Sequence, residues 1–216
     1  ASPPIVASTS TSVEFGATMV ALHMHPETLL GDELDLPRFA RVLDELGPEG
    51  RLDTMRHVSS PLMARLYEAA RGFRSLDLTA LVPADVPPLT EVIHVGQNNL
   101  PAFDRFQKRF CKPEGDGPVT ELYGYNQQPW SWFSGPGYFV VRASTDEPGA
   151  LDIDYQVVPK AKPATWPTIA ENRGFGPTIV YGSMVDVLRG ISAHVTIGRA
   201  RRWGRMTGNY FVLCRT

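Results

Sequence analysis

Two histidines are the residues of this sequence best suited to proton transfer. His94 ends the short run Glu91-Val-Ile-His94 and is followed by Gln97, Asn98 and Asn99. A histidine titrates near neutral pH and can act as a general acid or base, while the amides could position a polar ligand group. Alternatively, the amides only form a turn. His194 is the second candidate, and it would equally serve as a cap at the end of a helix.

Two further histidines, in His23-Met24-His25, would point to the same side of a strand. A metal site needs another ligand at a suitable spacing, and Glu27 follows too soon while Glu33 follows too late. A helical zinc motif would need histidines at i and i+4. We therefore expect no metal site and no cofactor, and we rank a metalloenzyme last among the alternatives.

The sequence lacks the signatures of several enzyme classes. It contains no Gly-x-Ser-x-Gly motif and no Gly-x-x-x-x-Gly-Lys motif. Cys111 is predicted at the C-terminal end of a helix, where the helix dipole disfavours a thiolate. These features argue against serine-hydrolase, P-loop and cysteine-nucleophile chemistry.

An aromatic segment, Tyr123 to Phe139, holds seven of the 21 aromatic residues of the chain. Tyrosine and tryptophan combine a large apolar face with one hydrogen-bonding group, and the glycines and prolines of the segment allow close, stiff backbone paths. This composition suits the rim of a largely apolar ligand site. Alternatively, the rings only plug one end of a sheet. The predicted ligand-binding residues of the segment are Tyr123, Tyr125, Asn126, Trp130, Trp132 and Tyr138.

Asp154 and Arg199 are charged candidates for contact with the same ligand. Asp154 belongs to the run 151–158, in which apolar and polar residues alternate as in a strand with one buried face. Arg199 follows Val195 and Ile197 on one face of a predicted strand. That strand either leaves the core and ends in solvent, or it brings Arg199 to a pocket mouth where an anion binds.

The elements that must position these residues change in type along the chain. Asp35 and Pro37 begin a helix with an apolar stripe that ends at Gly47, and Ser60-Pro61 begins another that ends at Gly72. Apolar spacing predicts two more helices, at about 100–110 and from Ser183 to Ile191. The strands are predicted at 90–95, 119–125, 138–143, 151–158, 178–181, 194–203 and 209–215.

The fold class that follows is α+β. A helical N-terminal part packs on an antiparallel sheet that curls into a small barrel, with an open curved sheet as the alternative. We expect a loose or processed tail at 1–12 and one domain at 13–216. Within this domain, 13–82 is mainly helical, 83–89 is a proline-rich connector and 90–216 is mainly strand.

Composition limits the classes of partner that the protein is expected to bind. The net charge of −2 argues against nucleic acid as a partner. No run of about 20 apolar residues exists that would span a membrane. We expect a soluble protein, with the cytoplasm favoured and export still open, and the oligomeric state is left undetermined.

Cys111 and Cys214 are expected to be buried free thiols, although a pair would be possible in an exported chain.

The C-terminal part resembles the closing strands of small calycin-type barrels. The likeness covers about 40 residues, with His194-Val-Thr-Ile-Gly198, a turn, and Gly208-Asn-Tyr-Phe-Val-Leu-Cys214. Calycin-type barrels hold hydrophobic molecules; for this chain the likeness implies only a similar barrel fold, and it transfers no functional residue.

Three hypotheses for function follow from these patterns. The first is binding of a small hydrophobic or amphipathic molecule in an aromatic-lined cavity. The second is a cofactor-independent isomerase, cyclase or dehydratase that uses the same cavity, with His94 or His194 as its acid or base. The third is a protein-interaction module that docks a partner through the aromatic patch.

Overall fold

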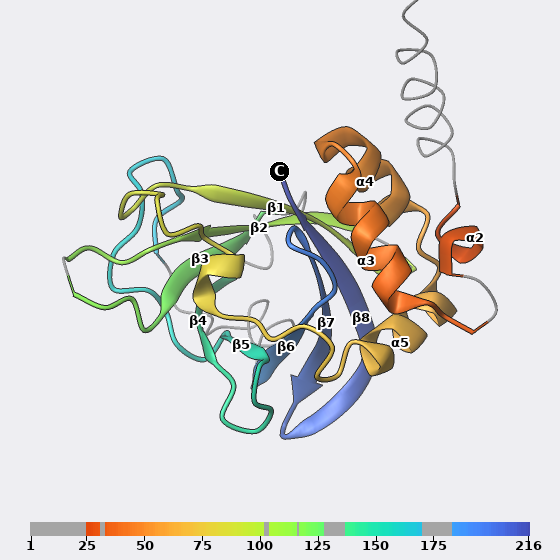
Figure 1. The fold of residues 1–216 in the computed structure, drawn as a ribbon. Helices are drawn as coiled ribbons and strands as arrows, with labels where there is room; N and C mark the ends of the chain where they lie inside the picture. Colours follow the sequence, from red (N-terminus) through yellow and green to blue (C-terminus); the bar gives the residue numbers. More distant parts are fainter. Residues whose placement is uncertain (1–24, 31–32, 102–103, 116, 128–136, 170–182) are drawn as a thin grey trace, which may run out of the picture.

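Eight antiparallel strands close into a barrel in the computed structural model of the chain (Figure 1). The structure describes residues 25–30, 33–101, 104–115, 117–127, 137–169 and 183–216. Each strand pairs with the next one in sequence, and β8 pairs with β1 to complete the ring. The strands are β1 (Val92–Asn98), β2 (Arg105–Cys111), β3 (Leu122–Gln127), β4 (Tyr138–Ala143), β5 (Leu151–Asp154), β6 (Met184–Gly190), β7 (Val195–Arg202) and β8 (Arg205–Arg215). The predicted α+β class and small barrel are thereby confirmed, and the open sheet is wrong.

The last two strands form an antiparallel hairpin. Arg202 pairs with Arg205, so the turn consists of Trp203 and Gly204 alone. Both of these residues have positive φ angles, of 48° and 74°, as a two-residue hairpin turn that follows the strand twist requires. The turn is therefore tighter than the five residues, 204–208, that separate the predicted strands 194–203 and 209–215.

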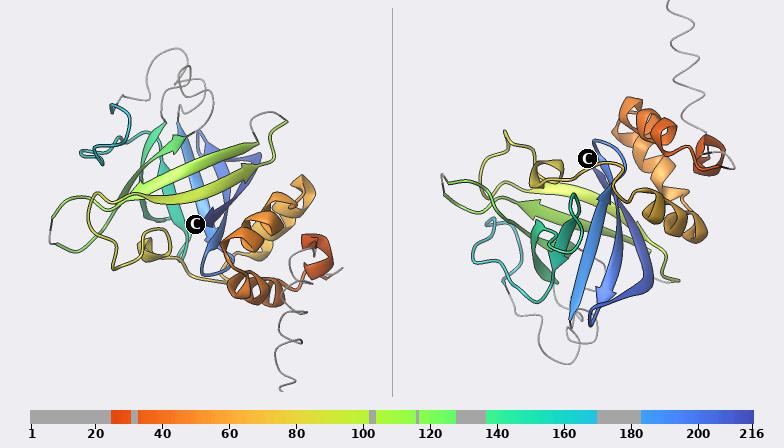
Figure 2. Two further views of the ribbon diagram at one scale, coloured as in Figure 1. Left: turned by 90° about the horizontal axis from the view of Figure 1, so that it is seen from above. Right: turned by 60° about the horizontal axis from the view of Figure 1, so that its bottom comes forward.

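The helices lie together on one side of the barrel (Figures 1 and 2). They are α2 (Pro26–Leu30), α3 (Leu36–Glu45), α4 (Pro48–Arg56) and α5 (Ser60–Ala69). The apolar stripes of α3 and α5 form one buried cluster with outward side chains of β7 and β8, such as Ile197 and Val212. Both of these helices were predicted, and the Asp35 carboxylate accepts a hydrogen bond of 2.9 Å from the backbone of Arg38 at the start of α3.

Helix α4 has no counterpart among the predicted helices because its buried side is partly polar. Arg51 and Thr54 are both buried there, next to Met55. The Arg51 guanidinium donates hydrogen bonds of 3.0 and 2.7 Å to the carbonyl oxygens of Leu43 and Leu46. This arginine therefore satisfies carbonyl groups at the end of α3, a role that an apolar periodicity does not reveal.

Two predicted helices are strands in the structure. The segment predicted as a helix at about 100–110 contains β2, in which Phe106 and Phe110 lie on the inner side of the barrel. The segment 184–191 contains β6, where the neighbouring residues Val187 and Leu188 are both buried. Strand β6 is buried on both faces and loses the period of two, so its apolar residues can mimic a helical stripe.

One end of the barrel is closed by the segment that follows α5. The short 3₁₀ helix η1 (Leu78–Ala80) leads into Leu81 and Val82, which are almost fully buried among inward-facing strand residues. Residues 83–89, the predicted connector, contain no helix or strand. The tail 1–12 and the predicted strand 178–181 lie outside the described residues.

Three glycines let phenylalanine rings lie flat across the inside of the barrel. In each pair a Cβ added to the glycine would come within 2.1–2.5 Å of the opposite ring. Aromatic rings laid across glycines in this way compensate for the missing side chain and fill the interior. The pairs are Gly96 with Phe106, Gly124 with Phe139, and Gly198 with Phe211.

Two further findings concern the cysteines and the length of the helices. Cys111 and Cys214 are both buried and unpaired. None of the described helices combines the length and the apolar character that crossing a bilayer demands.

Candidate functional site

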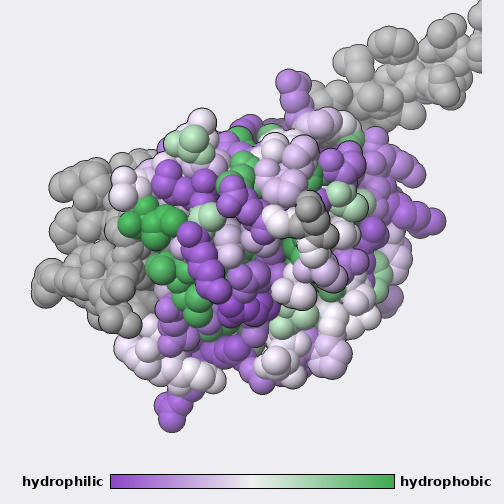
Figure 3. Space-filling model, turned by 90° about the vertical axis from the view of Figure 1, so that its left-hand side faces the viewer, coloured by the Kyte–Doolittle hydropathy of each residue, from purple (hydrophilic) through white to green (hydrophobic). Residues whose placement is uncertain are grey.

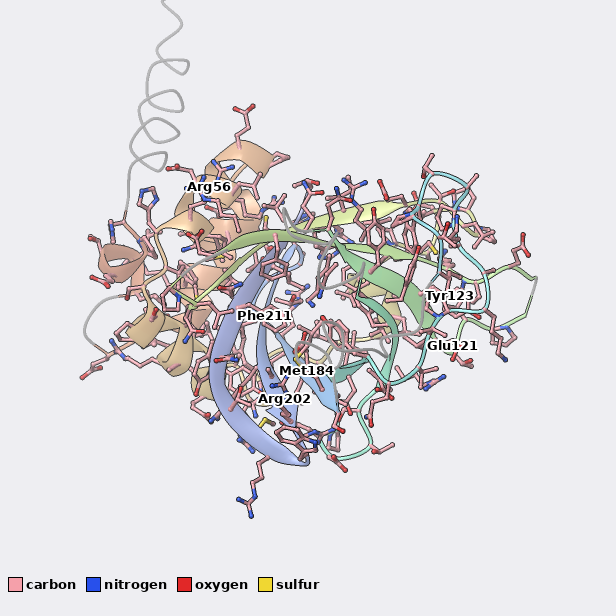
Figure 4. All side chains as sticks on the ribbon, turned by 180° about the vertical axis from the view of Figure 1, so that it is seen from behind. Arg56, Glu121, Tyr123, Met184, Arg202 and Phe211 are labelled. Carbon is pink, nitrogen blue, oxygen red and sulfur yellow. The ribbon has the colours of Figure 1, made fainter. Side chains whose placement is uncertain are left out.

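A cavity of about 210 Å³ occupies the end of the barrel opposite η1. Its walls are largely aromatic and apolar, and its outer part includes Leu100 and Asn209, which are exposed, so it opens to solvent. Figure 4 shows Phe211 and Met184 within the ring of strands, with Arg202 beside them. The described lining residues are Asn98, Leu100, Phe106, Lys108, Asn126, Tyr155, Met184, Asp186, Ala200, Arg202, Thr207, Asn209, Tyr210 and Phe211.

A connected set of four polar residues lies in the wall of this cavity. The Lys108 ammonium donates to Asn126 Oδ1 at 2.9 Å, to Asp186 Oδ2 at 3.1 Å and to the hydroxyl of Tyr155. The Tyr155 hydroxyl also donates to Asp186 Oδ2 at 3.1 Å and accepts from the Asn126 amide at 3.0 Å. We call Lys108, Asn126, Tyr155 and Asp186 the polar cluster.

The strand period places these residues inside the barrel. Lys108 lies between Phe106 and Phe110 on the inward side of β2, and Asn126 follows Gly124 on the inward side of β3. Tyr155 directly follows β5, where it continues the inward series of Leu151 and Ile153. Because inward residues alternate with outward ones, the barrel brings together groups that are up to 78 positions apart.

Lys108 is an ion enclosed by aromatic rings. Its side chain is 2% exposed and that of Asp186 is 5% exposed. Its nitrogen lies 5.0–5.5 Å from the ring centres of Phe106, Phe139, Tyr155 and Phe211. Burial lowers the pKa of Lys108, and the nearby Asp186 carboxylate opposes that change. The cluster is therefore a buried ion pair with no net charge in a largely apolar cavity.

His94, the first predicted catalytic residue, lies in the barrel interior near the closed end. Its Nε2 is 2.9 Å from the carbonyl oxygen of Leu81, so Nε2 carries the proton, while Nδ1 is buried and has no hydrogen-bond partner among the described residues. Its ring meets that of Phe110 edge-on at 4.9 Å. It is not among the residues that line the cavity, and its catalytic role stays a prediction.

His94 makes the stability of the protein sensitive to acid. Burial lowers its pKa from 6.5 to about 4, so the unfolded chain binds a proton at higher pH than the folded chain does. The stability it contributes is complete above pH 6.5 and is lost as the pH falls towards 4. We expect a loss of about 3 kcal/mol between these values, measured by urea unfolding, because each pKa unit corresponds to about 1.4 kcal/mol.

The variant His94→Gln supplies the control for this expectation. Glutamine keeps an amide donor for the Leu81 carbonyl oxygen and does not titrate. The free energy of unfolding of this variant should therefore change less than that of the unmodified chain over the same pH range. The difference between the two pH profiles isolates His94 from other titrating groups. Parallel profiles would contradict the assignment.

Tyr123, Tyr125 and Tyr138 lie together on the outer face of β3 and β4. They form a buried cluster with Cys111 and Trp166, separate from the interior cluster of the barrel. The Tyr138 hydroxyl donates to the carbonyl oxygen of Pro167 at 2.5 Å, and Trp166 lies edge-on to Tyr125 at 4.9 Å. Figure 4 shows Tyr123 outside the ring of strands. These tyrosines are not among the residues that line the cavity, and their binding role stays a prediction.

The remaining predicted residues are scattered. Asn126 belongs to the polar cluster, whereas Asp154 is half-buried on the other face of the sheet, where it accepts from the backbone of Gln156 at 2.8 Å. Arg199 lies on the outer face and donates to the Thr207 carbonyl oxygen and to Glu68. His194 lies in the turn after β6, not at a helix end, with Nδ1 3.2 Å from the Arg215 guanidinium.

Trp130, Trp132 and His23 lie outside the described residues. His25 is described, and its ring faces that of His57 at 5.6 Å. In the described part of the chain, no three histidine, cysteine, aspartate or glutamate side chains gather as a metal site would require.

Sequence reasoning missed three members of the polar cluster: Lys108, Tyr155 and Asp186. Lys108 was hidden because its segment was interpreted as a helix. In the correct strand register, Phe106, Lys108 and Phe110 share one face, and a lysine between two phenylalanines on a buried face is the signal that would have found it.

Comparison with known proteins found no match for this chain among family models, curated proteins or solved structures.

Proposed function

We propose that the protein binds a small, uncharged amphipathic molecule in the barrel cavity. The apolar part of the ligand lies against Phe106, Phe211 and Tyr210, and its polar group forms a hydrogen bond with the polar cluster. The observation that carries this proposal is the buried ion pair of Lys108 and Asp186 in the wall of a cavity that also exposes the rings of Phe106, Tyr210 and Phe211.

The energetics of a buried ion pair support a role in binding. Removing two charges from water costs several kcal/mol, and apolar residues of similar size would stabilise a barrel interior as well or better. A cavity that opens to solvent beside such a pair therefore favours ligand recognition over stability. Aromatic walls with a few fixed polar groups are the usual composition of small-molecule sites.

The charge of the cluster selects the class of ligand. Asp186 already neutralises Lys108, so the polar cluster offers no uncompensated cation to a carboxylate placed beside it. A carbonyl or hydroxyl group adds no charge and can exchange hydrogen bonds with Lys108, Asn126 or Tyr155. We therefore expect neutral ligands to bind better than anions of the same shape.

The size of the cavity suggests the probes for a test. A cavity of about 150 Å³ is known to hold benzene, so a volume of about 210 Å³ accommodates a benzene ring with a small polar group. We expect benzyl alcohol to raise the Tm of the full chain more than toluene or benzoate at equal concentration. A larger shift with benzoate would contradict the preference for neutral ligands.

A cavity-filling variant locates the binding site. Ala200 is buried, pairs with Asp186 across β6 and β7, and lines the cavity, so Ala200→Leu should abolish the benzyl alcohol shift. Ala143→Leu, at an exposed end of β4, is the matched control and should retain it. If the Ala200 variant binds as the unmodified chain does, the cavity is not the site. Native mass spectrometry of the purified chain would then reveal any natural ligand held elsewhere.

A second candidate is a cofactor-independent enzyme that transfers a proton within the same cavity. The observation that favours it is the direct contact of three proton-carrying groups, those of Lys108, Tyr155 and Asp186. The polar cluster would supply the acid and the base in place of His94 and His194, which do not line the cavity.

The interaction module has less support from the described surface. Trp203, at the tip of the β7–β8 hairpin, is 74% exposed, and Met206 on the same hairpin is also exposed, whereas the other exposed large apolar side chains lie on separate segments: Phe73, Leu100 and Val119. Figure 3 shows one side of the molecule as mainly hydrophilic, with hydrophobic residues confined to small groups. Such scattered residues are normal for a protein surface.

A further inference from the structure

We propose that Lys108 forms an imine with a small aldehyde or ketone that enters the cavity, an inference that rests on the binding function proposed above. The carbonyl compound is then a covalent ligand or a substrate, and Lys108 is its nucleophile. Desolvated lysines are the usual amines for this chemistry because enclosure in apolar surroundings favours the neutral, nucleophilic form.

The position of Lys108 meets the first requirement of such a reaction. Its nitrogen is enclosed by four aromatic rings, yet the residue lines a cavity that opens to solvent. Burial also lowers the pKa of Lys108, which favours the neutral amine that attacks a carbonyl carbon. A carbonyl compound that enters the cavity therefore lies beside the Lys108 side chain.

Asp186 meets the second requirement, a group that accepts and returns a proton. The Lys108 ammonium first gives one proton to the Asp186 carboxylate, 3.1 Å away. The free amine attacks the carbonyl carbon, and a proton moves from nitrogen to the former carbonyl oxygen to give a carbinolamine. Asp186 then returns its proton to that hydroxyl, and the C–O bond breaks to release water and a protonated imine.

The charge of the site is the same before and after this sequence. Ammonium with carboxylate becomes protonated imine with carboxylate, and the three hydrogens of the ammonium end as one on nitrogen and two in water. The buried pair therefore never needs an external counter-ion. Tyr155 and Asn126, which both contact Lys108, are placed to hydrogen-bond the carbinolamine oxygen.

The chain carries its own control lysines. It has only three others, Lys112, Lys160 and Lys162. The Lys112 ammonium donates to the carbonyl oxygens of Ala84 and Val86, and that of Lys162 donates to the carbonyl oxygen of Trp166. Lys160 is exposed. None of the three lines the cavity, so selective reaction at Lys108 reports on the cavity alone.

Reductive trapping tests the proposal directly. The full chain is incubated briefly with benzaldehyde and sodium cyanoborohydride, and tryptic peptides are mapped by mass spectrometry. We expect one benzyl group on Lys108, little on the other three lysines, and loss of the Lys108 label when benzyl alcohol competes. Lys108→Arg, which keeps the charge and cannot form an imine, should lose this label and retain whatever the other lysines acquire.

The outcomes separate this inference from the binding function. In one outcome, benzaldehyde raises the Tm of the unmodified chain but not that of the Ala200→Leu variant, while Lys108 stays unlabelled. In that case the imine proposal is wrong and the binding proposal stands. If benzaldehyde causes no shift and no label, both proposals fail. Equal labelling of all four lysines also overturns the imine, because it shows no advantage for the enclosed amine. Mapping the unmodified chain gives this answer even if the arginine variant does not fold.

Discussion

Replacing Arg189 with methionine is expected to lower the free energy of unfolding by about 3–5 kcal/mol, measured by urea denaturation at pH 7. Arg189 is 2% exposed and makes two hydrogen bonds, of 2.6 and 2.8 Å, to the Glu147 carboxylate. It also donates to the carbonyl oxygen of Tyr67 at 2.6 Å, and its guanidinium lies 3.9 Å from the centre of the Tyr67 ring. Removing it leaves Glu147 and a buried helix carbonyl without their partner.

An exposed arginine on the same barrel is the matched control. Arg142 pairs with Glu121 at 2.6 Å, but its side chain is 48% exposed. Arg142→Met should therefore cost less than about 1 kcal/mol. A loss below 1 kcal/mol for the Arg189 variant would contradict the view that this residue fixes α5 to β6. The comparison distinguishes burial from charge, since both variants remove one guanidinium from a carboxylate.

The elements that could be predicted are those in which local signals and tertiary environment agree. Helix α3 has a cap, an early proline and one apolar stripe, and β5 alternates between buried and half-buried residues. Strands β2 and β6 are predicted as helices for different reasons. β6 is buried on both faces, so the spacing of its apolar residues no longer reports the strand period, whereas the inward face of β2 carries Lys108 between Phe106 and Phe110, which interrupts the apolar alternation.

The site could be predicted only in part because barrel closure assembles it. Asn126 was identified from the aromatic segment, but the other members of the polar cluster, Lys108, Tyr155 and Asp186, come from three other parts of the chain. The aromatic clustering in sequence led to the outer face instead, where Trp166 completes the tyrosine cluster. Neighbouring residues of a strand point to opposite faces, so an aromatic run need not form one surface.

Replacing Asp186 with asparagine is the second change with a large expected effect. It should lower the free energy of unfolding by about 3 kcal/mol at pH 7, because the Lys108 ammonium loses its counter-ion in a buried site. The Lys108 pKa should fall further below its usual value, so the unfolded chain binds the proton more tightly than the folded one. The deficit should therefore shrink as the pH rises towards 10.

Asp154→Asn is the control for the Asp186 variant. Asp154 is half-buried on the neighbouring strand and accepts hydrogen bonds only from Gln156 among its described contacts. The same chemical change should therefore alter the stability by less than about 1 kcal/mol. An equal loss in the two variants would show that the Asp186 result does not depend on Lys108.

The double variant Lys108→Met with Asp186→Leu decides whether the ion pair exists for stability or for function. Two apolar side chains remove both buried charges, so the free energy of unfolding should return to that of the unmodified chain or exceed it. The same variant should lose the benzyl alcohol shift and offer no amine for trapping. Stability regained while binding is lost is the trade-off that a functional site predicts. If the double variant is as unstable as Asp186→Asn, the pair is needed to hold the barrel together, and the main argument for a ligand at Lys108 is lost.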